Sequence, residues 1–346
     1  QDYTVEGFST VTYEGTGAAQ YIGGTGFSPD FVWIKNRGRA QSHVLHDTVR
    51  GATGGEAYLL KSDSSNAETT FDGFGLTTFD ADGFTVIGNG GLTNLTGDTY
   101  VAWNWDMGGT TASNTSGSIT SSVRANTTYG QSIISYTGNS TTGATVGHGL
   151  TSAPTLTITK NRGSTNNWPV YSSTLGASSR IILDGSGAAA TGRIEWNSTA
   201  PTSTVITLGN HSGVNTAYDY ITYAFHDVAN YSKFGSYSGT GSSNAITTGF
   251  APAFLMVKRT NSTGNWVMWD NARVPSGVIV GDYLQANLSD PENDPTGSNA
   301  VTFTTTGFTL TGNGIYSNSS SDTFIYMCFA DTREYAYWYD QSGNNN

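Results

Sequence analysis

Cysteine is nearly absent from this 346-residue chain, in which Cys328 is the only one. A single cysteine excludes disulfides within the chain and any zinc site built from several cysteines. Cys328 lies in the apolar run FIYMCFA, which indicates a buried structural thiol rather than a nucleophile. The sequence therefore offers neither a disulfide framework nor cysteine chemistry.

Charged residues are also scarce, at 12% of the chain, or about half of the usual share. The 15 lysines and arginines are scattered, and the formal net charge is −11. Nucleic acids and anionic membrane surfaces are bound by stripes of Lys and Arg, so we expect neither as a partner. No run of about 18 apolar residues occurs, and we therefore predict no membrane insertion.

Common catalytic motifs are absent as well. The chain has no Gly-x-Ser-x-Gly nucleophile elbow, no phosphate-binding P-loop and no His-Glu-x-x-His zinc motif. A carboxylate pair for glycoside hydrolysis stays open, because such pairs are close in space rather than in sequence. Glu195, in RIEWN, is the one tempting carboxylate, and we expect it on a surface strand. We predict no catalytic residues and no cofactor, and hence no enzyme.

Two acidic segments could suggest a metal site. DADG (80–83) resembles half of a calcium-binding loop, but a complete loop needs more ligands and a distal Glu. SDPENDP (289–295) carries its carboxylates among prolines, which is typical of an exposed connection with solvated charge. We interpret the first segment as a turn and the second as a surface loop, and we predict no bound metal.

Glycine, with 44 residues, and aromatic side chains, at 12%, are abundant. A disordered chain would lack these aromatics. Together with the alternation of apolar and polar residues, this composition predicts an all-β protein with many turns and packed aromatic cores. The chain starts at Gln1 without an apolar leader, so we expect a mature or trimmed portion of a longer protein.

One segment plan recurs three times in the sequence. Residues 13–38, 136–163 and 237–261 each contain Tyr-x-Gly, a polar turn, Gly-[Phe/Leu] followed by Pro, an alternating strand and a Lys. Each copy then closes with a second shared strand, DTYVAWNWD, YDYITYAFHD or DTFIYMCFAD. A period of about a hundred residues is too long for a solenoid and suits a small sandwich domain.

We therefore predict three tandem antiparallel β-sandwich modules of jelly-roll or lectin-like type, each with two stacked sheets. Residues 110–129, rich in Gly, Ser and Thr, are predicted to form a linker or an extended loop. The predicted boundaries are 1–109, 130–229 and 233–335 for the modules and 336–346 for a polar tail.

The segment KNRGRAQSHVLHDTVRG (35–51) is the stretch that looks most like a functional site. His43 and His46 lie three residues apart, with Asp47 beside them. A spacing of three would put the two histidines on opposite faces of a strand, which is a poor arrangement for holding one ion. A metal or catalytic site is therefore the least favoured interpretation.

The other copies provide controls for these histidines. When the copies are aligned on their lysines, aromatic residues match both histidines: Trp168 and Trp266 match His43, and Tyr171 and Trp269 match His46. We favour the interpretation that the histidines pack as rings. The alternative is a binding site specialised in the first module. The candidate ligand-binding residues across the three copies are Arg37, His43, His46, Trp168, Trp266 and Trp269.

The strings GFSPDFVWIKNRGRAQSHVLHDTVRG, LLKSDSSNAE, TTFDADGFTVIGNG and GDTYVAWNWDMGG resemble a repeat module of virion structural and tail-fibre-like proteins of tailed phages, especially marine and cyanobacterial ones. The likeness is close over residues 8–109 and is limited to the skeleton of the plan in the other two copies. It brings no catalytic residues with it. The resemblance implies a component of a phage particle on its external surface, and it favours an appendage that meets the host.

Two classes of function follow. The first is a non-enzymatic tail fibre or adhesin that binds the host surface, with a glycan as the favoured receptor and an affinity multiplied by oligomerisation. The second is a purely architectural role, as a capsid-decorating protein or an extracellular filament subunit. A polysaccharide depolymerase is the third and weakest hypothesis.

Other virion proteins and further copies of the chain are the expected partners. We expect a homo-oligomer, with a trimer favoured because fibre proteins commonly trimerise. Three modules in one chain could instead form a pseudo-threefold unit on their own, because consecutive copies can bury matching surfaces. Tyr and Trp near polar loops suit carbohydrate recognition, although most of these side chains are expected in the core.

Overall fold

The computed structural model describes residues 7–53, 56–273, 282–293 and 299–331. These residues form antiparallel sheets joined by turns, and no helix occurs among them. The prediction of an all-β protein is therefore confirmed. This part of the chain accordingly contains no helix with the length and hydropathy needed to span a membrane.

The first repeat, residues 8–105, contains a four-stranded central sheet and two sheets of three strands. The order of the central sheet is β1 (Phe8–Glu14), β10 (Thr99–Trp105), β3 (Phe31–Asn36) and β4 (Val44–Asp47). The two smaller sheets are β2 (Gln20–Gly23), β9 (Gly83–Ile87) and β8 (Gly75–Asp80), and β5 (Ala52–Thr53), β6 (Glu56–Leu59) and β7 (Thr69–Asp72).

The second repeat, residues 112–225, has the widest sheet. Its order is β11 (Ala112–Asn114), β12 (Ser121–Asn126), β13 (Gln131–Thr137), β20 (Asp219–Phe225), β15 (Leu156–Asn161), β16 (Pro169–Ser172), β17 (Ser179–Ile182) and β18 (Ala190–Thr191). A separate pair is formed by β14 (Ala144–Gly147) and β19 (Val205–Leu208).

Residues 110–129 differ from the linker or extended loop that their composition predicts. They contain β11 and β12, and β12 pairs with β13 along its whole length. Val123 and Ile119 from this segment are buried in the core of the second repeat. Thr favours strands, and the burial of Ile119 and Val123 together with the pairing to β13 holds this segment on the sheet.

The third repeat, residues 232–329, has a narrower central sheet than the second. Its central sheet has the order β21 (Ser232–Ser238), β28 (Thr323–Phe329), β23 (Phe254–Arg259), β24 (Trp266–Asp270) and β25 (Leu284–Gln285). Its second sheet has the order β22 (Asn244–Thr247), β27 (Gly307–Thr311) and β26 (Ala300–Thr304).

The same strand order and register occur in all three repeats. β1-β10-β3-β4, β13-β20-β15-β16 and β21-β28-β23-β24 are equivalent. The repeat lysines also keep one register, since Lys35, Lys160 and Lys258 pair with Val101, Ile221 and Ile325 on the neighbouring strand. The sequence alignment on these lysines is thus a structural alignment.

Each central sheet buries both of its faces. In β3, Val32 and Ile34 face the core of the first repeat, while Phe31 and Trp33 face the opposite way, as their alternation predicts. The opposite faces of all three sheets join in one shared aromatic core. Its ring pairs include Phe31 with Tyr223 at 4.2 Å and Phe8 with Phe329 at 5.4 Å between centroids.

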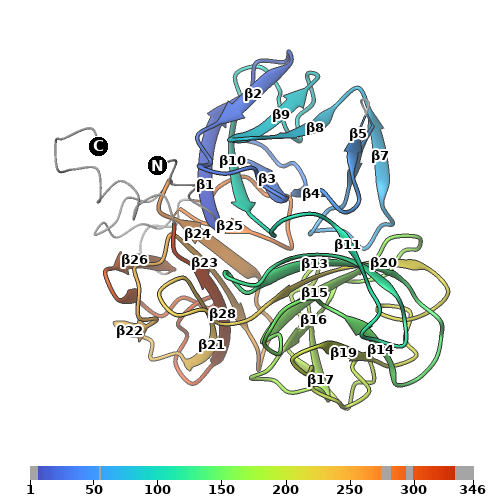
Figure 1. Ribbon diagram of the computed structural model, residues 1–346. Coiled ribbons are helices and arrows are strands. Elements are labelled where there is room, and N and C mark those ends of the chain that lie inside the picture. Colours follow the sequence, from blue (N-terminus) through green and yellow to red (C-terminus); the bar gives the residue numbers. More distant parts are fainter. Residues whose placement is uncertain (1–6, 54–55, 274–281, 294–298, 332–346) are drawn as a thin grey trace, which may run out of the picture.

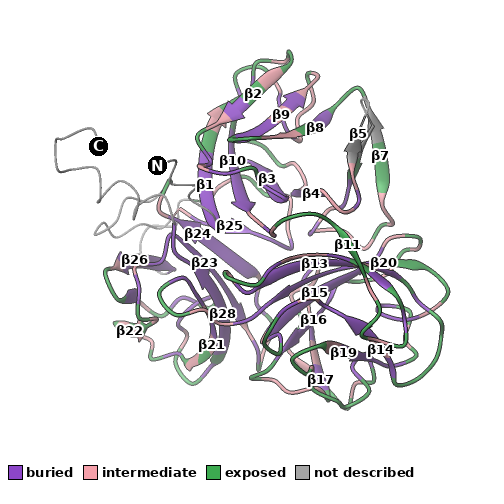
Figure 2. Cartoon of the chain, viewed as in Figure 1, coloured by how far each residue is buried: buried purple, intermediate pink, exposed green. Residues whose placement is uncertain are grey.

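Figure 1 shows the three central sheets meeting in the middle of the molecule, with the smaller sheets β2-β9-β8, β14-β19 and β22-β27-β26 on the outside. Buried residues accordingly gather at the centre and exposed ones at the outer turns (Figure 2). Each large apolar side chain fully buried there contributes about 1.5–3 kcal/mol to folding. The shared core is therefore a main source of stability and makes the repeats mutually dependent.

The Tyr-x-Gly element of the repeat has a steric explanation. A Cβ on Gly15, Gly138 or Gly239 would lie 2.3, 2.2 or 2.1 Å from a carbonyl oxygen of the facing loop. The tyrosine two residues earlier stacks on a ring of the neighbouring strand, for example Tyr13 on Tyr100 at 5.0 Å. Glycine thus allows the close approach, and the ring pair holds the strand that leads to it.

Candidate functional site

His43 lies in the shared core, just before β4. The Nε1–H of Trp33 donates to His43 Nδ1 at 2.9 Å, and the His43 ring stacks near Trp103. Burial, followed by the nearby positive charge of Lys35, lowers the pKa of His43 well below its usual value. The ring is therefore a neutral packing group, like Trp168 and Trp266 at the equivalent positions.

His46 lies on the other face of the sheet, within the first repeat. Its Nδ1 is 3.1 Å from the carbonyl oxygen of Tyr58. Burial, assisted by Arg50, lowers the pKa of His46 to about 3. The two histidines thus face opposite ways, as their spacing predicts, and no group of three or more potential metal-ligating side chains occurs in the described part of the chain.

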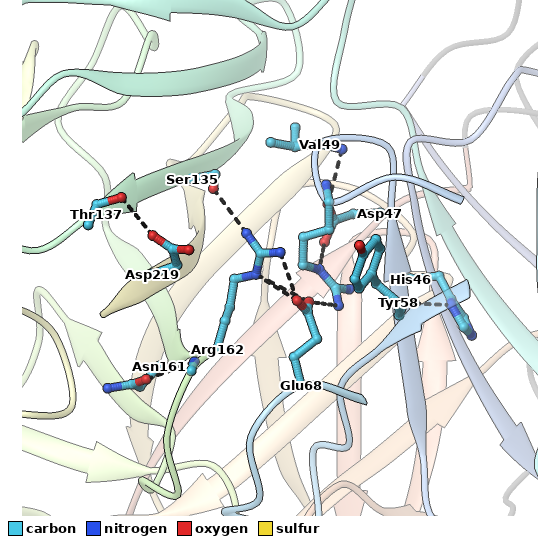
Figure 3. A network of polar contacts seen from close by, with 12 residues as sticks. His46, Asp47, Val49, Tyr58, Glu68, Ser135, Thr137, Asn161, Arg162 and Asp219 are labelled. Atoms are coloured by element: carbon cyan, nitrogen blue, oxygen red, sulfur yellow. Dashed lines mark hydrogen bonds and ion pairs between the residues drawn. The ribbon is translucent and has the colours of Figure 1, made fainter. Parts of the chain in front are cut away.

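The polar residues that follow His46 form a network between the first and second repeats (Figure 3). Arg50, which is fully buried, pairs with Asp47 and with Glu68 at 3.0 Å. The Tyr223 hydroxyl of the second repeat donates to Asp47 at 2.7 Å. Glu68 also pairs with Arg162 of the second repeat at 2.7 Å. Burial opposes the charge on Arg50, but Asp47 and its other partners raise its pKa.

An equivalent network joins the third and first repeats. Arg273 is fully buried and pairs with Asp270 and with Glu292, each at 2.7 Å. Glu292 also pairs with Arg37 of the first repeat at 2.7 Å, and the Nε1–H of Trp103 donates to Asp270 at 3.0 Å. Glu68 and Glu292 are thus each held by an arginine of their own repeat, and each also pairs with an arginine of a neighbouring repeat.

Three main-chain hydrogen bonds close the repeats into a ring. The N–H groups of Glu68, Ala189 and Glu292 donate to the carbonyl oxygens of Arg162, Thr260 and Arg37 at 2.9, 2.8 and 2.7 Å. Each bond joins a loop of one repeat to the residue two positions after the lysine of another. The first repeat therefore binds the second, the second binds the third, and the third binds the first.

The repeat lysines are part of these same contacts. Lys160 Nζ donates to the carbonyl oxygen of Ser65 in the first repeat at 2.9 Å, and Lys258 Nζ donates to that of Gly187 in the second at 2.8 Å. Lys35 Nζ donates to the carbonyl oxygen of Asn36 in its own repeat at 2.6 Å, and Asp63 of the first repeat and Asp290 of the third are among the nearby carboxylates. Burial lowers the pKa of Lys35 and Lys160 to about 8 and that of Lys258 to about 7.

The structure places the six candidate ligand-binding residues mostly inside the molecule. His43, His46, Trp168, Trp266 and Trp269 are all buried. The indole N–H groups of Trp168 and Trp266 donate to the carbonyl oxygens of Lys61 and Ile182, which belong to the neighbouring repeats. Arg37 is partly exposed and pairs with Glu292. Trp168, Trp266 and Arg37 thus contact neighbouring repeats, His43 lies in the shared core, and His46 and Trp269 lie inside the first and third repeats.

Two expectations about carboxylates are wrong. Glu195 is fully buried in a turn rather than on a surface strand, where Arg180 and Arg193 hold it and lower its pKa against the effect of burial. Glu292, in the segment expected to be a solvated loop, lies in the network between two repeats with its side chain only 14% exposed. Residues 294 and 295 of that segment lie outside the described residues.

The DADG segment is a turn, as predicted. It connects β8 and β9, with Asp80 paired to Gly83. Asp82 accepts hydrogen bonds from the N–H groups of Gly24 and Gly26 at 3.2 and 2.6 Å, and Asp80 accepts one from the Thr85 hydroxyl at 2.7 Å. Both carboxylates therefore have partners within the protein.

A cavity of about 430 Å³ opens on the first repeat, beside His46. Its apolar wall is provided by Val44, Leu59 and Leu92, and the side chain of Phe74 stands at the surface. The complete lining is Gln41, Ser42, Val44, His46, Leu59, Lys61, Phe74, Gly75, Asn89, Gly90, Gly91, Leu92 and Thr93. This cavity is the candidate binding site, and sequence patterns give no sign of it beyond the exchange of a large ring for His46.

Among known protein families, the model of a family described as a domain of unknown function, DUF7483, matches residues 4–333. No curated protein and no solved structure matches the chain.

Proposed function

The chain belongs to the DUF7483 family, and we propose that it is a non-enzymatic structural protein on the external surface of a phage particle. In this proposal it is a tail fibre or another appendage that contacts the host, with a glycan as receptor. Its three repeats are three β-sandwich modules of jelly-roll or lectin-like type. The resemblance of residues 8–109 to tail-fibre-like phage modules supports the placement on a particle.

The ion pairs between the repeats are the main support for a structural role. Glu68 lies between Arg50 and Arg162, and Glu292 lies between Arg273 and Arg37. Each carboxylate pairs with one guanidinium group of its own repeat and one of the neighbouring repeat, and largely buried pairs of this kind hold together the parts that they join. The polar clusters that most resemble catalytic sites thus serve contacts between repeats.

The arrangement of the sheets also suits display on a surface. The shared core holds the three central sheets, and the turns of the smaller sheets point outward (Figure 1). Large apolar side chains are exposed on the first, second and third repeats, at Tyr21, Ile194 and Ile315. Outward turns on a rigid scaffold are the usual place for recognition of a partner.

The closed ring of contacts supports a pseudo-threefold unit within one chain. Each repeat binds the other two through the main-chain bonds of Glu68, Ala189 and Glu292. A chain that supplies its own threefold arrangement needs no further copies to bury these surfaces. The trimer of chains stays a prediction, which light scattering on the purified chain would test.

The location of the chain on an intact particle tests the proposed function. Cryo-electron microscopy of the phage should find it projecting from the tail or capsid with its outer turns free. If its outer turns are instead buried among its own copies in a continuous lattice or filament, the role is architectural and the host-contact proposal fails. If purified particles lack the chain, the virion proposal itself is wrong.

A further inference from the structure

The first repeat carries a histidine, His46, beside this cavity, where the other two repeats carry larger rings. Tyr171 and Trp269 occupy this position in the second and third repeats, where both are buried. Tyr171 packs against Trp196, and Trp269 against Tyr283, with ring centroids 5.9 and 6.3 Å apart. An imidazole is smaller than either ring, and the cavity of about 430 Å³ opens at this side chain.

We propose that this cavity binds a neutral hydroxylated ligand, namely a monosaccharide unit of a glycan. The inference rests on the proposed host contact, for which it supplies a place and a ligand class. It also gives His46 a role as the hydrogen-bond acceptor for one ligand hydroxyl.

The hydrogen bonding of His46 determines which group it offers to a ligand. Its Nδ1 lies 3.1 Å from the carbonyl oxygen of Tyr58, and a carbonyl can only accept, so Nδ1 carries the proton. Nε2 is then an acceptor, and it is buried without a hydrogen-bond partner in the protein. A buried acceptor without a partner is destabilising, and a ligand O–H group would supply the missing hydrogen bond.

The charge state of His46 favours a neutral ligand. Because burial and Arg50 lower its pKa to about 3, the ring stays uncharged at the pH of natural waters and of cells. An acceptor nitrogen attracts the hydrogen of a hydroxyl group and repels an anionic oxygen. Lys61 is the one charged side chain of the lining, and its ammonium group can donate a hydrogen bond to a hydroxyl oxygen.

The mouth of the cavity has the groups that sugar recognition requires. Phe74, which is 42% exposed, offers an aromatic ring for the apolar face of a pyranose. Gln41 and Asn89 offer amide groups for hydroxyls, and the backbone N–H of Thr96 donates to Asn89 Oδ1 at 3.0 Å, which fixes that amide. Convergent polar groups over an apolar wall, in a volume of about 300–1,000 Å³, are typical of small-molecule sites.

Two glycines keep the mouth open. A Cβ on Gly91 would lie 2.8 Å from Gln41 Nε2, and a Cβ on Gly90 would lie 3.1 Å from Phe74 Cδ1. Side chains at these positions would press on the amide and the ring that the ligand is proposed to contact. The backbone thus leaves space between the recognition groups.

Saturation-transfer NMR on the complete purified chain tests the inference. The probes are methyl glycosides of glucose, galactose and mannose, and N-acetylglucosamine, each at millimolar concentration. We expect transfer to at least one probe, and at least tenfold weaker binding in two variants. H46Y introduces the larger ring of the second repeat and removes the imidazole acceptor, while F74A removes the exposed ring and leaves the core intact.

A matched control and the possible outcomes complete the test. Y218A removes an aromatic ring of similar exposure, 45%, from the second repeat and should bind like the parent chain. Transfer to no probe, or equal transfer in the parent, H46Y and F74A, overturns the inference. If no sugar binds but the chain projects from phage particles, the proposed function stands and only the cavity inference fails. If the sugar binds but the chain is absent from particles, the cavity inference stands and the proposed function fails.

Discussion

Glu68 of the first repeat and Arg162 of the second form an ion pair of 2.7 Å, and the N–H of Glu68 donates to the carbonyl oxygen of Arg162 at 2.9 Å. The same carboxylate holds Arg50, which is fully buried. The Glu68 side chain therefore pairs with a buried arginine, alongside Asp47, and also joins two repeats.

The substitution E68A should lower the free energy of unfolding by about 3 kcal/mol, because it removes a partner of buried Arg50 and the bridge to Arg162. Chemical denaturation measures the change. The control is K233A, which breaks the pair of Lys233 and Asp227, both substantially exposed, and should cost at most about 1 kcal/mol. An E68A loss no larger than that of the control would contradict the role of Glu68.

The sequence predicts those parts of the structure that show in the alternation of apolar and polar residues or in the internal repeat. Alternation correctly assigns Trp33 and Ile34 to opposite cores, and the alignment correctly gives His43 the position of Trp168. Ion pairs between loops that are distant in the sequence produce no such pattern, and Glu292 was therefore expected in a solvated loop. The alignment of Arg50 with Arg273 was a usable signal, since an arginine that recurs at a repeat position indicates a shared role.

The buried lysines should make stability rise with pH. Lys35 and Lys160 have a pKa of about 8 in the folded chain and Lys258 of about 7, against 10.5 for a free lysine. Between about pH 7 and 10 the unfolded chain binds more protons, so the free energy of unfolding increases with pH. Tyrosines with raised pKa, such as Tyr136, oppose this above pH 10.

The variant K258M should flatten this rise, when urea denaturation is compared at pH 7, 8 and 9. K233M, at an exposed lysine, should keep the slope of the parent chain. Equal slopes in the parent chain and K258M would mean that Lys258 titrates normally in the folded state.

His43 should contribute to instability in acid. Its folded pKa lies well below 6.5, so below that pH the unfolded chain takes up a proton that the folded chain does not, and stability falls. H43W should cost about 1–3 kcal/mol at pH 7, because the Trp33 N–H loses its acceptor. Between pH 7 and 5 the free energy of unfolding of H43W should nevertheless fall by less than that of the parent chain. A steeper fall in H43W would contradict the lowered pKa of His43.

Metal removal should leave the fold unchanged. The carboxylates of Asp80 and Asp82 already accept hydrogen bonds from Thr85, Gly24 and Gly26. We expect the same Tm with and without EDTA in differential scanning calorimetry. A fall of several degrees that added Ca²⁺ reverses would show a cation at an acidic turn.

The glycine of the Tyr-x-Gly element should resist substitution for a steric reason. In G15A the new Cβ would lie 2.3 Å from the carbonyl oxygen of Leu95, which no rotamer change can relieve. The strand or the facing loop must move, and we expect a loss of about 1–3 kcal/mol in the free energy of unfolding. G109A is the matched control, because nothing lies within 4 Å of its Cβ and its φ is not positive. A G15A variant as stable as G109A would mean that the facing loop yields freely, and the recurrence of this glycine in all three repeats would then need another cause.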